Sequence, residues 1–224
     1  MTQAVGMEIA LPTKEERRAR SSFSRSKPMA QVAVKLDNGG VCDIVVPVRA
    51  ARLLRDEGLS FPLDVDDAFD AIHALEGRVC LTMLVELLGR RDHSAAEARE
   101  KLAAYGFRDE ELDAAIARGI ERRYLDDARF MSYFIEERKR RGWGRRKIEV
   151  ELKRKGTDPA ELPGYPDAYF TSEDDGARAT ALLEHKRVPE NRAFEKLTRF
   201  LMTKGFSYEV ASAAVRERLA DTAS

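Results

Sequence analysis

This 224-residue sequence has few of the residues that commonly carry chemistry. It contains two cysteines, three histidines and one tryptophan, and Cys42 and Cys80 lie far apart without a Cys-x-x-Cys spacing. Such thiols are expected to stay reduced, and no histidine stands at a metal-ligand spacing to them. No apolar run is long enough for a signal peptide or a membrane span, which predicts a cytoplasmic protein without membrane contact. We expect no metal and no cofactor.

Motifs of the common enzyme classes are also missing. There is no Gly-Lys-Ser/Thr loop for nucleotide phosphates, and Gly142-Trp143-Gly144 lacks the third glycine of a dinucleotide fingerprint. The carboxylate pairs 126–127 and 174–175 could hold a metal, but each lies just before a predicted helix, where N-capping explains it. Ser94 has no neighbouring base and is predicted to cap a helix. The sequence therefore predicts a protein that is not an enzyme.

Charge of one sign is not in excess overall, but it is concentrated locally. The chain has 39 Lys and Arg against 39 Asp and Glu. Residues 138–156, here called the basic stretch, hold ten basic side chains and only two acidic ones, Glu149 and Glu151. Such a patch attracts polyanions or acidic protein surfaces. The alternative is a solvated helix face with no binding role.

Trp143 lies in the middle of the basic stretch, between two glycines. Its ring could stack on a nucleic-acid base, or it could fold back onto its own helical bundle. The helix–turn–helix arrangement superficially suggests DNA-binding modules. However, the basic stretch belongs to one of three repeated segments of the chain, and the other two are not strongly basic. This difference argues against several equivalent DNA-binding units. It favours one long protein partner with an anionic groove.

Three segments, 94–107, 144–157 and 193–206, align with one another at steps of 50 and 49 residues. A period near fifty indicates one supersecondary unit used three times. A glycine that ends each helical pattern provides the left-handed residue of a C-terminal cap. The aligned leucines are Leu102, Leu152 and Leu201, and the aligned glycines are Gly106, Gly156 and Gly205.

The chain divides into five predicted segments. Residues 1–30 are polar and basic, which predicts a disordered tail. Residues 31–75 predict a β-hairpin around the turn 37–40, followed by two helices at about 48–55 and 64–75. Three-helix repeats follow over 76–125, 126–172 and 173–220.

Within the repeats, helical spacing of apolar residues predicts the helices, the first of them over 79–90. Ser94, Asp109 and Asp126 are predicted N-caps. The third helix of the second repeat is expected to begin at Asp158 and to break at the prolines of segment 163–166. The predicted fold class is mainly α: three tandem three-helix repeats in an elongated array, preceded by a small β-hairpin and helix module.

Segments of all three repeats are similar in sequence to a known protein family. The segments LGRRDHSAAEAREKLAAYGF, DDARFMSYFIEERKRRGWGRRKIEVELKRKG and FLMTKGFSYEV resemble the RecX family of modulators of the RecA recombinase, over about residues 79–219. The matching positions of structural motifs are Ser94, Leu102, Gly106, Asp126, Arg129, Phe130, Gly142, Gly144, Ile148, Leu152, Gly156, Leu201 and Gly205. Ala98 departs from the family pattern, where a larger aliphatic residue is usual.

The resemblance implies a regulator that binds in the groove of the RecA filament on single-stranded DNA. There it would inhibit ATP hydrolysis, recombination and coprotease activity, and so modulate DNA repair and the SOS response. The residues predicted to face RecA or DNA are Arg90, Arg91, Arg138, Lys139, Arg140, Arg141, Trp143, Arg145, Arg146, Lys147, Lys153 and Arg154. We expect a monomer, with RecA and the enclosed DNA as partners and at most weak direct DNA binding. The alternatives are a free-standing nucleic-acid-binding repeat protein and a helical adaptor for another partner.

Overall fold

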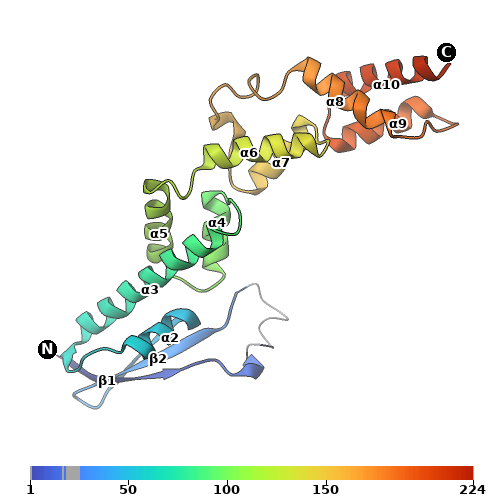
Figure 1. The fold of residues 1–224 in the computed structure, drawn as a ribbon. Helices are drawn as coiled ribbons and strands as arrows, with labels where there is room; N and C mark the ends of the chain where they lie inside the picture. The colour runs from blue at the N-terminus through green and yellow to red at the C-terminus, as the bar shows by residue number, and fades with distance from the viewer. Residues whose placement is uncertain (1, 17, 19–25, 224) are drawn as a thin grey trace. The chain divides into compact units, whose positions relative to one another are not determined.

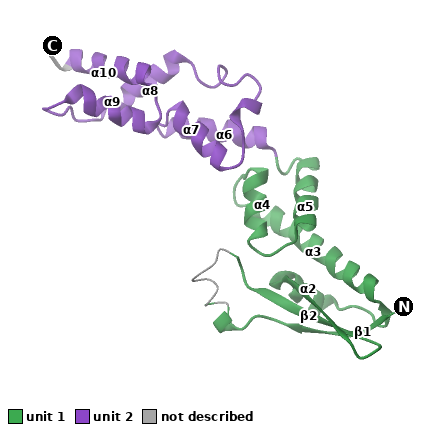
Figure 2. Cartoon of the chain, turned by 180° about the vertical axis from the view of Figure 1, so that it is seen from behind, with its two compact units in different colours: residues 1–125 green, residues 126–224 purple. Residues whose placement is uncertain are grey.

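The computed structural model describes residues 2–16, 18 and 26–223. The chain forms two compact units, Met1–Leu125 and Asp126–Ser224 (Figure 2). Helices dominate both units, and one small antiparallel sheet lies in the first. The predicted fold class, mainly α with an N-terminal β module, is confirmed.

The first unit begins with a four-stranded sheet in the order β3-β2-β1-β4. The predicted hairpin is present: β2 and β3 pair antiparallel, with Ala33 opposite Asp43. Gly39 in the connecting turn has φ +81°, a conformation that favours glycine. The strands are β1 (Gln3–Ala10), β2 (Met29–Leu36), β3 (Val41–Pro47) and β4 (Leu63–Asp64).

Strand β1 corrects the prediction of a disordered tail over residues 1–30. It pairs with both β2 and β4, and Ala4 is fully buried. The segment has weak strand character of its own, because it is mixed in polarity and contains Gly6. Its partner β2 lies about twenty residues further along the chain. Residues 3–10 therefore form a strand because of tertiary pairing and not because of local propensity. Residues 17 and 19–25 of the predicted tail lie outside the described residues.

One long helix, α3 (Val65–Leu88), replaces the two helices predicted over 64–75 and 79–90. Gly77 lies inside it, and glycine in a helix interior costs about 1 kcal/mol relative to alanine. Burial of the α3 side chains on both sides of Gly77, such as Ile72 and Leu84, outweighs that cost. The unit also contains α2 (Val48–Glu57), α4 (Ala95–Ala103) and α5 (Asp109–Glu121).

Helix α3 also corrects the boundary predicted between residues 75 and 76, which falls inside it. Figure 1 shows α3 running from beside the sheet to α4 and α5. A single core includes Val32 of the sheet, Leu84 of α3 and Leu112 of α5. The β module and the first repeat therefore fold as one body.

The second unit holds the other two repeats, each with its own core. Phe130, Ile135 and Leu152 belong to the first of these cores, and Leu183 and Leu201 belong to the second. The elements are α6 (Asp127–Arg140), α7 (Arg145–Arg154), the 3₁₀ turn η1 (Pro159–Glu161), α8 (Ser172–Glu184), α9 (Ala193–Lys204) and α10 (Tyr208–Ala223).

The predicted break in the third helix of the second repeat is confirmed, since only η1 forms there. The structure supplies a physical account of the broken segment. Leu162 and Phe170 are buried in the repeat core, and Tyr165 and Tyr169 pack against it. Large side chains from an irregular segment thus cover the face that a third helix would cover.

The helix caps are mostly as predicted. The Oγ of Ser94 accepts a hydrogen bond from the Glu97 amide, and the Asp126 carboxylate accepts one from the Arg129 amide. Two expectations were wrong. Arg108, and not Asp109, is the N-cap of α5, and Thr171, and not the 174–175 pair, caps α8. These carboxylates lie within the first turn of their helices, where the helix dipole also favours them.

The repeated glycines have the left-handed conformation that the spacing predicted. Gly106, Gly156 and Gly205 have φ values of +89°, +72° and +99°. In the second repeat the amide of Thr157 donates to the Leu152 carbonyl at 3.2 Å, as a Schellman cap requires. The corresponding bond in the third repeat also measures 3.2 Å and joins Phe206 to Leu201.

Candidate nucleic-acid and protein interface

The basic stretch occupies the end of α6, the turn 141–144 and the whole of α7 in the second unit. Its cations fall into two groups, those that pack on aromatic rings or acids and those that face solvent. Arg90 and Arg91, the other predicted contacts, follow α3 in the first unit. Both arginines are exposed, and Arg91 pairs with Glu97 at 2.7 Å.

Trp143 packs onto its own bundle rather than projecting from it. The indole is half-buried against the core of the second repeat. The Arg138 guanidinium lies 4.9 Å from the ring centroid and the Lys147 ammonium lies 4.1 Å from it, both within cation–π range. Arg138 also lies 4.6 Å from the Phe134 ring. These two cations therefore hold the turn together and are only partly available to a partner.

Lys139 has a structural role that its sequence context does not reveal. Its ammonium donates to the Tyr169 carbonyl at 2.8 Å and pairs with Asp174 at 3.1 Å. Only 14% of the side chain is exposed. Lys139 thus ties α6 to the irregular segment before α8.

Arg145 is held by a local network with Glu149 and Tyr165. Its Nε donates to the Glu149 carboxylate at 2.7 Å, and the Tyr165 hydroxyl donates to the same oxygen at 2.6 Å. The hydrogen bond to Glu149 raises the pKa of Arg145, while burial and that same carboxylate raise the pKa of Tyr165. The network fastens segment 163–166 onto α7, so charge reversal of Arg145 would disturb folding as well as binding.

The second group faces solvent. Among the described residues, Arg140, Arg146 and Lys153 are exposed and form no ion pair, although Glu149 attracts Lys153 electrostatically. Arg146, Val150 and Lys153 share one face of α7, because they are spaced at i, i+4 and i+7. Val150 is 59% exposed, so this face presents an apolar side chain between two cations. Arg141 and Arg154 are also largely exposed but pair with Glu137 and Glu151.

The turn 142–144 of the second repeat packs against the third repeat. The Gly144 amide donates to the Lys204 carbonyl at 2.8 Å, and the Arg146 amide donates to the Gly205 carbonyl at 3.1 Å. Arg178 of α8 donates to the Trp143 carbonyl at 2.7 Å and pairs with Asp174 and Asp175. Sequence reasoning missed Arg178, although it follows Asp175 at the same offset at which Arg129 follows Asp126.

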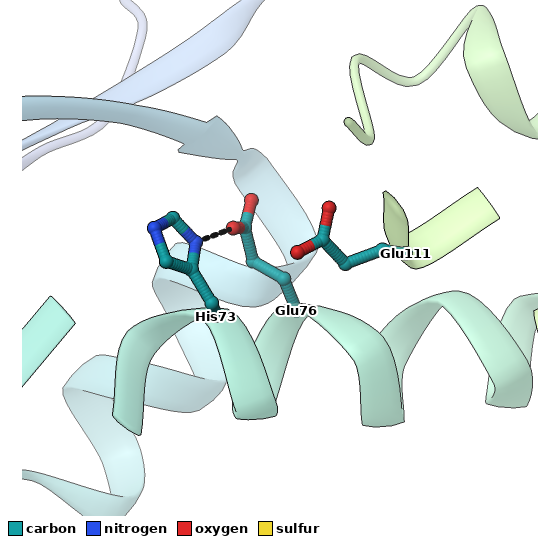
Figure 3. A group of neighbouring side chains, drawn as sticks. All are labelled: His73, Glu76 and Glu111. Atoms are coloured by element: carbon teal, nitrogen blue, oxygen red, sulfur yellow. Dashed lines mark hydrogen bonds and ion pairs between the residues drawn. The ribbon is translucent and has the colours of Figure 1, made fainter. Parts of the chain in front are cut away.

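A second polar cluster lies inside the first unit. His73 and Glu76 of α3 and Glu111 of α5 point toward one another (Figure 3). The His73 Nδ1 lies 2.9 Å from a Glu76 oxygen, while the other Glu76 oxygen is buried without a hydrogen-bond partner. Three potential ligand atoms lie within 4.8 Å of one another. However, Arg108 bonds both oxygens of Glu111, so the cluster is already a charge-compensated network.

Replacing Glu76 with glutamine tests how this network is charged. Burial, helped by the neighbouring Glu111, raises the pKa of Glu76 despite the opposing effects of His73 and Arg108. A carboxyl whose pKa rises on folding binds more protons in the folded state, so its contribution to stability falls as pH rises through that pKa. Glu76→Gln should therefore be more stable than the parent at pH 8, by about 1 kcal/mol, with a smaller difference at pH 5.

Urea unfolding of both proteins at pH 5, 6.5 and 8 measures this difference. Asp70→Asn, an exposed position on the same helix, controls for loss of one carboxylate. A Glu76→Gln variant that is less stable than the parent by the same amount at every pH would contradict the assignment.

No helix in the described part of the chain is both long and apolar enough to cross a membrane.

Comparison with known proteins supports the repeat architecture and identifies the family. Residues 126–161 match the family model described as RecX, second three-helix domain. The regulatory protein RecX of Vibrio vulnificus (strain CMCP6) is 30% identical over 150 residues, which cover 64% of this chain and 93% of that protein. RecX of Pseudomonas entomophila (strain L48) is 33% identical over 131 residues, covering 56% of this chain and 83% of the relative.

Two solved structures share the fold. A crystal structure of regulatory protein RecX superposes with a TM-score of 0.56 at 18% identity, covering 94% of this chain and 97% of that one. RecX from Lactobacillus salivarius gives 0.55 at 18% identity and covers 63% of this chain and 95% of its own. At this level of identity the structures establish the fold, while the sequence relatives establish the family. The chain belongs to the RecX family of regulatory proteins.

Proposed function

We propose that this protein regulates the RecA recombinase by binding in the groove of the RecA filament on single-stranded DNA. There it inhibits ATP hydrolysis, recombination and coprotease activity, and thereby modulates DNA repair and the SOS response. The observation that carries the proposal is the solvent-facing side of the basic stretch in a member of the RecX family. Arg140, Arg146 and Lys153 are free to meet DNA phosphates or acidic side chains of the filament.

The placement of charge on α7 supports a binding role over a purely structural one. A helix N-terminus favours acidic residues, but the first turn of α7 has none and contains Arg145, Arg146 and Lys147. These cations add to the positive potential of the helix end instead of compensating it. A sequence selected for helix stability alone would not accumulate positive charge there.

Linked repeats suit a polymeric partner. Once one repeat has bound a filament, the others bind intramolecularly, so contacts of modest strength add to tight overall binding. The paired cations Arg141 and Arg154 can exchange their acidic partners for filament groups at little cost, because exposed ion pairs are worth about 0–1 kcal/mol.

The test is the DNA-dependent ATPase rate of RecA from the same organism while this protein is titrated. A fall in rate at substoichiometric ratios is expected, because each bound molecule blocks growth of a filament or spans several protomers. A reaction that contains this protein but no RecA measures the background rate of ATP hydrolysis. An unchanged rate at excess protein would overturn the proposal.

The same exposed cations favour a second candidate, a free-standing nucleic-acid-binding protein. Such a protein would bind naked single-stranded DNA at sub-micromolar concentration, with log K falling by about 0.7 per phosphate contact for each unit of log salt. A filament regulator instead prefers RecA-coated DNA. Comparing both substrates at 50 and 200 mM salt separates the two functions.

A further inference from the structure

The first unit contains a pocket that lies outside the basic stretch. Its volume is about 540 Å³, and its walls come from α2, α3, α4 and the segment before β2. Five cations line it: Lys27, Arg49, Arg52, Arg90 and Lys101. This gathering is notable because residues 1–125 as a whole hold 19 Lys and Arg against 21 Asp and Glu. Only Arg90 of these five belongs to the predicted interface.

Most of this charge is available to a ligand. The single acidic residue in the lining, Glu86, is held by Arg49 through two hydrogen bonds of 2.5 and 2.6 Å. The hydrogen bonding to Arg49 lowers the pKa of Glu86, and the positive charge of Arg90 adds to this effect. Within the described residues, the other four cations are exposed and form no ion pair: Lys27, Arg52, Arg90 and Lys101. Arg90 is attracted electrostatically by Glu86, whose hydrogen bonds go to Arg49.

The rest of the lining is apolar and partly aromatic. Tyr105, just after α4, is 40% exposed, and Met83 and Leu87 of α3 form part of the wall with Pro47. The pocket is also anchored structurally, because the Lys27 amide donates to the Ala104 carbonyl at 2.7 Å. The Met29 side chain occupies the space that a side chain on Gly106 would fill. The glycine at this repeat position therefore leaves room for the segment that closes this side of the pocket.

The combination indicates the class of ligand. Cations without acidic partners bind phosphate groups, and an exposed tyrosine beside an apolar wall offers a surface on which a base can stack. The volume lies in the range of about 300–1,000 Å³ typical of small-molecule sites. An acidic peptide would need an extended groove to spread its carboxylates and does not require an aromatic wall.

We propose that this pocket binds a nucleoside phosphate, either as a free nucleotide or as one unit of a single strand. The proposal goes beyond the regulation of RecA and does not depend on it. The phosphate would lie among Arg52, Arg90 and Lys101, and the base would lie against Tyr105. Two readouts without RecA keep a failure here distinct from a failure of the proposed function.

The first readout is calorimetric titration of the full-length protein with dTMP and, separately, with inorganic phosphate. The second is fluorescence anisotropy with labelled ten-nucleotide oligo(dT), measured in an Arg146→Glu, Lys153→Glu background that reverses the two solvent-facing cations proposed for the α7 interface. The pocket variant carries Arg52→Glu and Lys101→Glu. Its matched control carries Arg118→Glu and Arg122→Glu, two exposed cations of the same unit outside the pocket. Thermal unfolding confirms that each variant is folded.

If the site takes a free nucleotide, dTMP should bind to the full-length protein. Its affinity should fall by about tenfold or more in the pocket variant and stay unchanged in the control variant. Binding of oligo(dT) with the same variant pattern, without dTMP binding, assigns the site to a strand. In either case Tyr105→Phe should bind and Tyr105→Leu should bind more weakly. The proposal is overturned if neither dTMP nor oligo(dT) binds, if the pocket and control variants behave alike, or if only inorganic phosphate binds.

Discussion

Replacing Gly144 with alanine is expected to disrupt the packing between the second and third repeats. A Cβ atom at Gly144 would lie 2.4 Å from the Gly205 carbonyl carbon and 2.4 Å from the Phe206 amide nitrogen. Both neighbours are backbone atoms, which cannot rotate away as a side chain could. Gly144 has φ −83°, so the cost is steric and not conformational. We expect a loss of about 3 kcal/mol, at the upper end for overpacking, with separation of the Gly144 and Gly205 turns.

Chemical denaturation of the full chain measures this loss, and Gly176→Ala is the matched control. Gly176 lies inside α8 with no atom within 4 Å of the position of an added Cβ. Alanine there should stabilise the helix by up to about 1 kcal/mol. The two substitutions add the same methyl group, so opposite signs isolate the backbone contact. If Gly144→Ala unfolds at the same denaturant concentration as the parent, the close packing of the two turns is wrong.

Reversing the charge of Arg146 and Lys153 together should weaken binding to the RecA filament by more than about tenfold at low salt. Both side chains are exposed on one face of α7, and neither forms an ion pair among the described residues. The variant should therefore fold normally, because surface substitutions usually change stability by less than about 0.5 kcal/mol. Reversal of Arg145 would be harder to interpret, because it breaks the network with Glu149 and Tyr165.

The matched control reverses Lys196 and Arg199 on α9, the corresponding helix of the third repeat. Both are exposed, and the net charge changes equally. Filament binding and inhibition of the RecA ATPase should be close to those of the parent at 50 mM salt. The difference between the two variants should shrink at 300 mM salt, because counterions screen exposed charges. Equal loss in both variants would indicate a general charge effect and would refute the assignment to α7.

The basic stretch therefore combines two roles that its composition does not distinguish. Arg138, Lys139 and Lys147 stabilise the unit by packing on rings or bonding backbone. Arg140, Arg146 and Lys153 remain available to a partner. Composition does not distinguish the structural cations from the solvent-facing ones. They differ in the position of each side chain on its helix and in whether an aromatic ring or a carboxylate lies nearby.

Local features were predictable because they depend on residues close together in the chain. The hairpin around Gly39, the caps at Ser94 and Asp126, and the left-handed glycines at the repeat ends all follow from turn and cap chemistry within a few residues. The repeat spacing likewise predicted the order of the helices. The break at 163–166 follows from proline, which removes a backbone donor.

Residue type and spacing alone were enough to identify the family, the mainly α class, the repeat and the location of the basic stretch. The three-dimensional structure was needed to establish that residues 3–10 form a strand, that α3 continues through Gly77, and which cations face solvent. It also established that Gly144 packs on Gly205, and that cations of α2, α4 and two connecting segments line one pocket with Tyr105. Each of these depends on contacts between residues distant in sequence, where burial and close packing outweigh local preference.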